Sequence, residues 1–304
     1  MIGQEIVVSA SRRREKVQEA PASISVLDSR KLMATPNDNP VRNLINTPGV
    51  QIQQQSAGKI NIQMRGTGGV FASSAFPIMD YRALKSAGLG TFDALNSPLN
   101  TLGLDRPGVV RGPGSALYGR GEPGGTINII TKKPQFLPAG SITLEGGSYD
   151  HKRLEGDYTR GINDELAFRV TGALQDSDSF RDEVFQRRKV LNPSLLFTPS
   201  DDTKVLYEGE YLNHEQLFDR GIVILDNDFD TVPRSRYLGE PEDGATEVRA
   251  IGHQLSLEQQ LNSEWRMSLG YSNRRSWLDG FSSDTELSPS RQSLYDDGET
   301  LTRQ

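Results

Sequence analysis

The segment from Val109 to Pro134, which reads VVRGPGSALYGRGEPGGTINIITKKP, is the part of the sequence that best indicates the fold. It begins with a short β-branched run and ends with Thr126 to Thr131, where apolar and polar residues alternate as in a strand. Six glycines and two prolines lie between these runs. Because glycine tolerates positive φ and proline fixes φ, this composition predicts several tight turns between two strands.

Part of this segment, Gly119 to Gly124, matches the G-x-G-x-x-G dinucleotide-binding pattern, whose glycines bring the backbone close to a pyrophosphate at a helix N-terminus. That pattern should follow a strand and open a helix, whereas here it leads into a strand-like run. A soluble nucleotide-binding enzyme is therefore the lesser alternative, and a helix after Gly124 would favour it. No set of nucleophile, base and orienting group indicates a hydrolase.

The segment as a whole resembles the end of the plug domain of TonB-dependent outer-membrane receptors, which reads R-G-P-x-x-x-L-Y-G and then G-G-x-I-N-I-x-T. The residues that match in register are Arg111–Pro113, Leu117–Gly119, Gly124–Gly125 and Ile127–Ile129. The form RGEPGG resembles the ferric-siderophore receptors within that family. The resemblance extends over nearly the whole chain.

This resemblance implies a receptor, and not an enzyme, in the outer membrane of a Gram-negative bacterium. Such receptors bind a ferric siderophore at the extracellular face and import it into the periplasm. Their partners are outer-membrane lipid and TonB of the inner-membrane energy-transducing complex. The same kind of transporter for another cargo, such as cobalamin or a glycan, is the alternative within the family.

Composition agrees with these expectations. A net charge of −6 and a pI near 5.3 argue against nucleic acid as a partner, for which a basic face is expected. The chain has no cysteine, and its three histidines are scattered without metal-ligand spacing. We therefore expect no cofactor and no metal site, so that any iron arrives carried by the siderophore.

Residues 1–136 are expected to form an α+β plug domain, with a small mixed sheet and short helices. Strands are predicted at Ser23 to Leu27, Val50 to Gln54 and Ile60 to Met64. The pair Asn39-Pro40 is an N-cap and first-turn proline for a short helix from Val41 to Asn46.

Residues 66–104 carry little regular signal and contain part of the expected ligand site. Ile78 and Met79 are expected to pack inside the plug. The resemblance implies that loops from this region and from the glycine-rich segment reach the ligand. The candidate ligand-binding residues are Phe71, Tyr81, Arg82, Tyr118 and Arg120. For Tyr118, packing beneath the loop is an equally supported alternative.

The N-terminal run Glu5, Ile6, Val7, Val8, Ser9 and Ala10 corresponds by resemblance to the TonB box, with Ser9 in place of the usual threonine. A short β-branched segment near a chain terminus can add itself as a strand to a foreign sheet edge. The alternative, equally supported by length and propensity, is a buried first strand of the plug.

Two plug arginines, Arg65 and Arg111, are expected to contact the barrel. A guanidinium facing a barrel interior needs a carboxylate partner, because a buried unpaired charge is costly. The resemblance implies that Arg111 docks on barrel glutamates, which we expect beyond Gln304. Just before it, Pro107-Gly108 departs from the family pattern and predicts a strand that is shortened or lies at a sheet edge.

Residues 137–304 are expected to form the first seven or eight strands of an antiparallel transmembrane β-barrel. In Leu166 to Gln175, apolar and polar residues alternate with the period of two that such strands show. Short turns at residues 161–164, 199–203 and 262–264 alternate with long polar segments at 176–186, 215–247 and 278–298, as in outer-membrane barrels. Plugged transporters use about 22 strands, so the barrel is expected to be incomplete in this chain.

Overall fold

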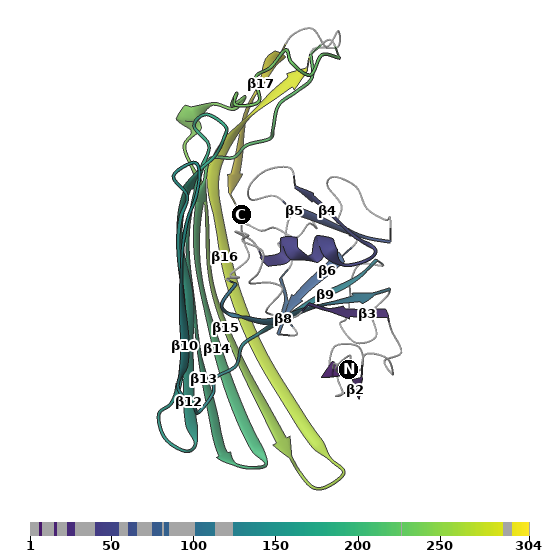
Figure 1. Ribbon diagram of the computed structural model, residues 1–304, viewed down its shortest axis with the longest axis vertical. Helices are drawn as coiled ribbons and strands as arrows, with labels where there is room; N and C mark the ends of the chain where they lie inside the picture. The colour runs from purple at the N-terminus through teal and green to yellow at the C-terminus, as the bar shows by residue number, and fades with distance from the viewer. Residues whose placement is uncertain are drawn as a thin grey trace. The chain divides into compact units, whose positions relative to one another are not determined.

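The computed structural model describes residues 6–7, 15–16, 23–27, 40–54, 60–65, 75–80, 82–84, 101–112, 124–225, 227–287 and 294–303. The chain divides into two compact units (Figure 1). The N-terminal unit comprises Met1–Gln54 and Lys59–Lys132, and the C-terminal unit comprises Gln55–Gly58 and Lys133–Gln304. Among the described residues, no helix is long and apolar enough to cross a membrane.

The N-terminal unit is built around a mixed five-stranded sheet with the order β3-β8-β9-β6-β7. Strands β6 and β9 are parallel, and the other neighbours are antiparallel. The bounds are β3 Ser23–Val26, β6 Ala75–Met79, β7 Arg82–Ala83, β8 Leu104–Arg111 and β9 Gly125–Thr131. The predicted strand at the end of the glycine-rich segment is therefore confirmed as β9, in the middle of this sheet.

Smaller elements complete the unit. Strands β4 (Val50–Gln54) and β5 (Ile60–Met64) form an antiparallel pair with the predicted bounds, and β1 (Ile6–Val7) pairs with β2 (Glu15–Lys16). The helix expected near Val41 is the 3-10 helix η1, Pro40–Asn46. One apolar core joins η1, β4 and β5 to strands β6, β8 and β9 of the five-stranded sheet. The residues buried in it are Leu44, Val50, Ile60, Ile62, Met64, Ala75, Met79, Leu84, Leu104, Val109, Ile127 and Ile129.

The expectation that Pro107-Gly108 shortens its strand or places it at an edge is wrong. Strand β8 is eight residues long and lies between β3 and β9. The missing proline donor is tolerated because the β3–β8 ladder ends at Val26 and Gly108. Leu27 still donates its N–H to the Pro107 carbonyl at 3.0 Å, and only the return bond is lost.

The region with little sequence signal contains β6 and β7. All five residues of β6 are buried, which confirms that Ile78 and Met79 pack inside the plug. A strand buried on both faces has no polar alternation, so its period-two pattern is absent from the sequence. Asp80, in the turn after β6, has φ of 47° and accepts hydrogen bonds from the Thr131 N–H and hydroxyl.

The C-terminal unit is one antiparallel sheet of eight strands, each paired with the next in the sequence (Figure 1). The strands are β10 Ala139–Gly146, β11 Lys152–Gly161, β12 Leu166–Asp178, β13 Phe185–Ser200, β14 Thr203–Gln216, β15 Thr246–Gln260, β16 Arg266–Leu287 and β17 Leu294–Arg303. Among the described strands, β10 and β17 each have one partner, so the barrel is not closed in this chain.

The short connections are found where they were predicted, but only one of the three predicted long connections is long, so the predicted strict alternation is wrong. The short connections are residues 162–165, 201–202 and 261–265, and the longest spans residues 217–245. The segment predicted at 176–186 shrinks to 179–184, and the one predicted at 278–298 contains the end of β16 and the start of β17. Polar residues within these segments continue the strands, because ladder hydrogen bonds do not require apolar side chains.

Candidate functional site

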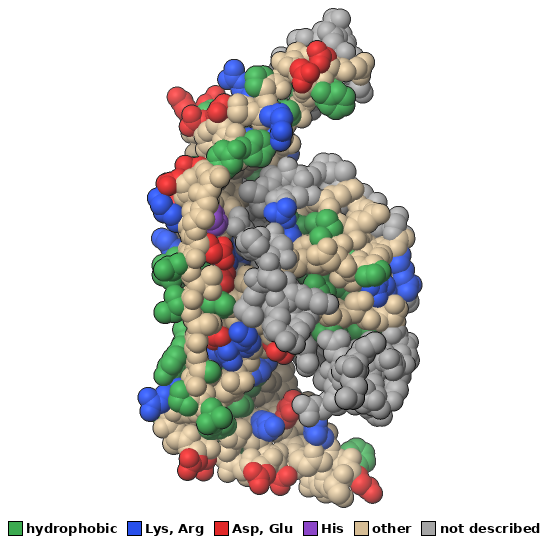
Figure 2. Space-filling view, in the orientation of Figure 1, with side chains coloured by type: hydrophobic (Ala, Val, Ile, Leu, Met, Phe, Trp, Pro, Cys, Tyr) green, Lys and Arg blue, Asp and Glu red, His purple; other side chains and the backbone are tan. Residues whose placement is uncertain are grey.

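The sheet of the C-terminal unit has one apolar face and one polar face, and the apolar face is the exposed one. Its exposed large side chains are Ile142, Leu144, Leu154, Tyr158, Val170, Leu174, Leu191, Leu195, Phe197, Tyr211, Ile251, Leu255, Leu269, Tyr271, Trp277 and Phe281. Figure 2 shows hydrophobic side chains along the middle of the sheet's visible edge and acidic ones at both ends. This arrangement is the reverse of a soluble sheet and matches a strand wall that faces lipid.

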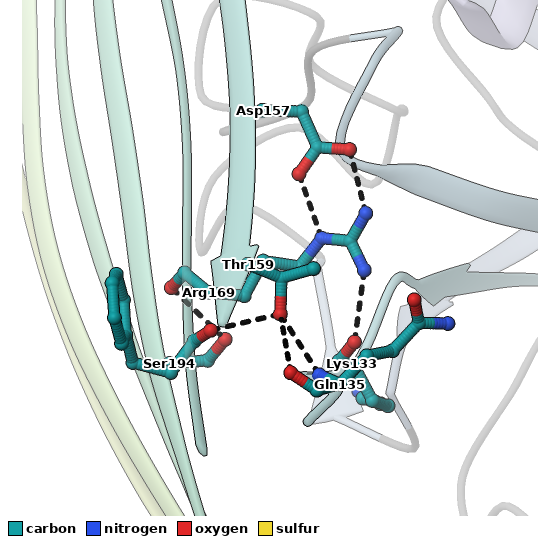
Figure 3. A network of polar contacts seen from close by, with 7 residues as sticks. Lys133, Gln135, Asp157, Thr159, Arg169 and Ser194 are labelled. Atoms are coloured by element: carbon teal, nitrogen blue, oxygen red, sulfur yellow. Dashed lines mark hydrogen bonds and ion pairs between the residues drawn. The ribbon is translucent and has the colours of Figure 1, made fainter. Parts of the chain in front are cut away.

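The opposite, polar face carries charged side chains in matched pairs. Arg169 on β12 forms a bidentate ion pair with Asp157 on β11, with Nε–Oδ1 at 2.7 Å and Nη2–Oδ2 at 2.6 Å (Figure 3). Arg274 donates to Glu210 at 2.6 Å. Both pairs join a guanidinium to a carboxylate on a different strand, which is the geometry that makes a buried ion pair tolerable.

A further charged group on this face is Arg153, which contacts Glu155 and the side-chain carbonyl of Gln175. All three residues are buried. Two of them, Arg153 and Glu155, alternate with apolar residues along β11, as Asp157 and Thr159 do. That R-x-E-x-D spacing is a signal that sequence analysis missed, and a period-two pattern of charges would have revealed it.

Two connections at one end of the sheet are tied together by Arg181. Its Nε lies 2.8 Å from Asp219 Oδ2, and its Nη1 donates to the carbonyls of Arg234 (3.4 Å) and Arg236 (3.2 Å). Asp182 N–H donates to the Ser235 carbonyl at 2.7 Å. The connection of residues 179–184 therefore holds the long connection of residues 217–245 in a defined conformation.

Tyr237 belongs to the same cluster, which we call the Arg181 cluster (residues 180–182, 218–219 and 234–237). Its hydroxyl donates to the Phe218 carbonyl at 3.2 Å. Burial, and then the carboxylates of Asp243, Asp219 and Glu240, raise the pKa of Tyr237 to about 12. The phenol therefore stays protonated and remains a hydrogen-bond donor at neutral pH.

In the N-terminal unit, the side chain of Arg111 is held by neutral acceptors. Its Nε donates to the Pro48 carbonyl at 2.9 Å, Nη1 to Ser23 Oγ at 3.2 Å and Nη2 to Ser25 Oγ at 2.8 Å. Burial, and then the nearby Arg65 guanidinium, lower the pKa of Arg111. Among the described residues neither arginine has a carboxylate partner, so contact with barrel glutamates stays a prediction.

Two positions of the motif, Gly112 and Gly125, require glycine for reasons of backbone conformation or space. Gly112 has φ of 103° and donates its N–H to the Gly124 carbonyl at 3.0 Å. Gly125 has φ of 150°, and a Cβ there would run into the Val110 carbonyl. Strand β9, and not a helix, follows Gly124, so the structural context of a dinucleotide site is missing.

The predicted ligand-binding and TonB-box residues are only partly described. Arg82 is half-buried at the start of β7, directly after the turn that Asp80 begins. Ile6 and Val7 form β1, whose partner is β2 and not the five-stranded sheet. The other predicted residues lie outside the described ones: Phe71, Tyr81, Tyr118 and Arg120 of the ligand site, and Glu5, Val8, Ser9 and Ala10 of the TonB box.

Comparison with known proteins identifies the N-terminal part. Residues 16–126 match the family model of the TonB-dependent receptor plug domain. The metal-pseudopaline receptor CntO of Pseudomonas aeruginosa is 36% identical over 212 residues, which cover 69% of this chain and 29% of that protein. The ferrioxamine receptor of Yersinia enterocolitica is 34% identical over 173 residues, which cover 51% of this chain and 24% of that protein.

Solved structures show the same fold beyond the plug. The ferric-catecholate import receptor Fiu of Escherichia coli K12, in its closed form, superposes with a TM-score of 0.80 at 19% sequence identity. The match covers 99% of this chain and 44% of that one. This chain thus spans less than a third of the length of the curated relatives described above.

Proposed function

Because this chain belongs to the TonB-dependent receptors, we propose that it forms the plug and first barrel strands of an outer-membrane receptor that binds a ferric siderophore and imports it into the periplasm. The observation that carries this proposal is the sheet with an exposed apolar face and a polar face of paired charges. A wall of this kind separates lipid from an aqueous interior. The plug-domain match in the same chain supports an interior that is blocked until the plug rearranges.

The class of cargo is supported by the relatives and by the RGEPGG form of the motif. One relative is named for ferrioxamine and another for a metal–pseudopaline complex. Iron in this proposal is part of the cargo, and the receptor needs no cofactor of its own. The CntO similarity favours one second candidate, a chelated metal complex other than a ferric one.

The energy for import is proposed to come from TonB, which takes residues 5–10 as an added strand. Among the described residues, Ile6 and Val7 pair with Lys16 and Glu15, so the described ladder that has to be released before a new partner can bind is short. Ligand contact by Phe71, Tyr81, Arg82, Tyr118 and Arg120 belongs to the same proposal. We place the receptor in the outer membrane of a Gram-negative bacterium.

The experiment that tests this proposal is calorimetric binding to the full-length receptor in detergent. The titrants are a panel of ferric siderophores, their iron-free forms, a metal–pseudopaline complex, cobalamin and a glycan. We expect saturable binding of one ferric form and much weaker binding of its iron-free form. Exclusive binding of the pseudopaline complex would establish the second candidate, and binding only of cobalamin or the glycan would refute both.

Coupling to TonB is tested separately by deletion of residues 5–10. The deleted receptor should bind its ligand with unchanged affinity but should no longer support uptake of a radiolabelled complex into cells. A matched control is deletion of a similarly short exposed segment, residues 227–231, in the connection between β14 and β15. Uptake that survives loss of residues 5–10 would remove the TonB-box assignment.

A further inference from the structure

We propose that Arg169, held by Asp157, is a positioning residue that clamps residues 133–136 to the sheet and thereby sets the point at which a pull on the plug stops. Residues 133–136, called the linker below, are the first residues of the C-terminal unit after the plug. This inference rests on the proposed function, because only a receptor whose plug is pulled needs such a stop.

The clamp begins with the third donor of the Arg169 guanidinium. While Nε and Nη2 are taken up by Asp157, Nη1 donates to the backbone carbonyl of Lys133 at 2.9 Å (Figure 3). The Asp157 carboxylate therefore fixes the orientation of the guanidinium, so that its remaining donor, Nη1, points toward the linker. Charge-assisted bonds of this kind are roughly twice as strong as neutral ones.

Four further contacts hold the linker, and one of them is the hydrogen bond that Thr159 Oγ1 donates to the Gln135 carbonyl at 3.2 Å. The N–H of Gln135 donates to Thr159 Oγ1 at 2.8 Å, and the Phe136 carbonyl accepts from the Gly161 N–H at 2.9 Å. The Lys133 ammonium contacts Glu208 on β14. The linker is thus fastened to three strands, β11, β12 and β14, through both its backbone and a side chain.

Gly161 gives independent support that the linker has a fixed place. A Cβ added to Gly161 would lie 3.0 Å from the Phe136 carbonyl oxygen and 3.3 Å from the Phe136 ring. Its φ is not in the left-handed region, so the backbone itself does not demand glycine. The residue leaves room for the linker.

The attachment changes from one unit to the other across a single peptide bond. Lys132 donates its N–H to the Gly103 carbonyl within the N-terminal unit at 2.9 Å. Lys133, the next residue, is bound through its carbonyl to Arg169 in the C-terminal unit. No unattached residue lies between the two attachments, so tension along the plug chain arrives at the clamp directly.

The first test is hydrogen–deuterium exchange of the full-length receptor in lipid nanodiscs, followed on peptides that cover the linker. Thr159→Val removes the acceptor for Gln135 N–H at nearly constant volume, and Arg169→Gln removes the guanidinium. Both should speed linker exchange about five- to tenfold, as expected for loss of one hydrogen bond. The matched control is Arg153→Gln, because Arg153 is a buried arginine on the same face that contacts Glu155 and Gln175.

In the control Arg153→Gln, linker amides should exchange at the same rate as in the parent receptor. Unchanged linker exchange in both Thr159→Val and Arg169→Gln would overturn the clamp. Equal acceleration in Arg153→Gln would also overturn it, since the effect would then be general loosening of the sheet.

The second test measures the stop itself by pulling single full-length receptors in nanodiscs through an N-terminal handle. Release of residues 1–132 should end at an extension of about 460 Å, at roughly 3.5 Å per residue. In Arg169→Gln the final extension should grow by at least the linker, roughly 14 Å at the same rise per residue. A parent receptor that extends beyond Lys133 at the same force would refute the proposal.

Neither test uses a ligand, so their outcome separates the clamp from the cargo. A receptor that binds no ferric siderophore but stops at Lys133 would contradict the proposed cargo and support the clamp. One that binds its ferric siderophore but shows no stop would contradict the clamp alone.

Discussion

Leucine 255 provides a direct test of what the apolar face contacts. It lies on β15 in a row that runs across five strands, through the register pairs Phe168–Leu195, Leu195–Tyr207, Tyr207–Leu255 and Leu255–Tyr271. Its side chain is 47% exposed. In water, Leu255→Arg on such a surface should change the free energy of unfolding by less than about 0.5 kcal/mol.

In a bilayer the same change is far more costly. An arginine on the lipid face of a β-barrel costs about 2–4 kcal/mol at the bilayer midplane and about 0–1 kcal/mol near the interface. Because Leu255 lies within the apolar row, we expect a loss of roughly 2 kcal/mol or more. The matched control is Leu261→Arg, since Leu261 is also exposed (58%) but lies in the connection between β15 and β16, at the end of the strands.

The assay is reversible urea unfolding of the full-length receptor in lipid vesicles, followed by tryptophan fluorescence. The expected result is a large loss of stability for Leu255→Arg and a loss below about 1 kcal/mol for Leu261→Arg. Equal and small effects at both positions would refute the conclusion that this face contacts lipid. Equal and large effects would show that exposure, and not depth in the bilayer, determines the cost.

Three further predictions concern the plug and the long connection. Ile127→Ala opens a cavity at a fully buried core position and should lower the unfolding free energy of the plug by about 3 kcal/mol, measured by denaturant unfolding. Gly125→Ala must adopt φ of 150° against backbone and should cost about 1–3 kcal/mol in the same assay. Gly146→Ala in β10 of the C-terminal unit, whose Cβ would make only an ordinary contact with the His151 carbonyl oxygen at 4.0 Å, should cost far less. The pKa of Tyr237 is higher in the folded state (about 12) than its ordinary value of 10, so the Arg181 cluster should loosen as pH rises from 10 to 12. This is checked by the anisotropy of a dye on Phe229→Cys, and Tyr237→Phe should abolish the response.

Much of the fold was predictable because its signals are local. Strands β4 and β5 were predicted residue for residue, since each is a short run of alternating apolar and polar residues. The short turns and the period of two in segments such as Leu166 to Gln175 likewise predicted the antiparallel sheet, although only one of the three predicted long connections is long. The resemblance of the glycine-rich segment to a plug domain is supported by the family match over residues 16–126.

The errors have physical causes. Strand β6 was missed because all its residues are buried, which removes the period of two. Strand β8 was expected to be short because Pro107 has no N–H to donate to a neighbouring strand. The sequence does not show that the neighbour, β3, ends at the point where that N–H would have been needed. Tertiary pairing decided both cases.

In the candidate site, too, some features were predictable from the sequence and others depend on tertiary contacts. Arg111 and the two glycines around it were recognisable from a motif, but the acceptors that hold its guanidinium come from Pro48, Ser23 and Ser25, far away in the sequence. The pairing of Arg169 with Asp157 depends on the register of two strands, which a single sequence does not specify. Residue types were therefore visible in advance, and their partners were not.

The strand order of the plug sheet, β3-β8-β9-β6-β7, determines how that sheet comes apart under load. Among its described strands, the first from the N-terminus, β3, is an edge strand with four paired residues. Strand β3 can therefore detach while the central strands of the sheet stay paired. Strand β9, the last in the sequence, is central and keeps neighbours on both sides. A pull from the N-terminus therefore detaches the edge of this sheet before its centre.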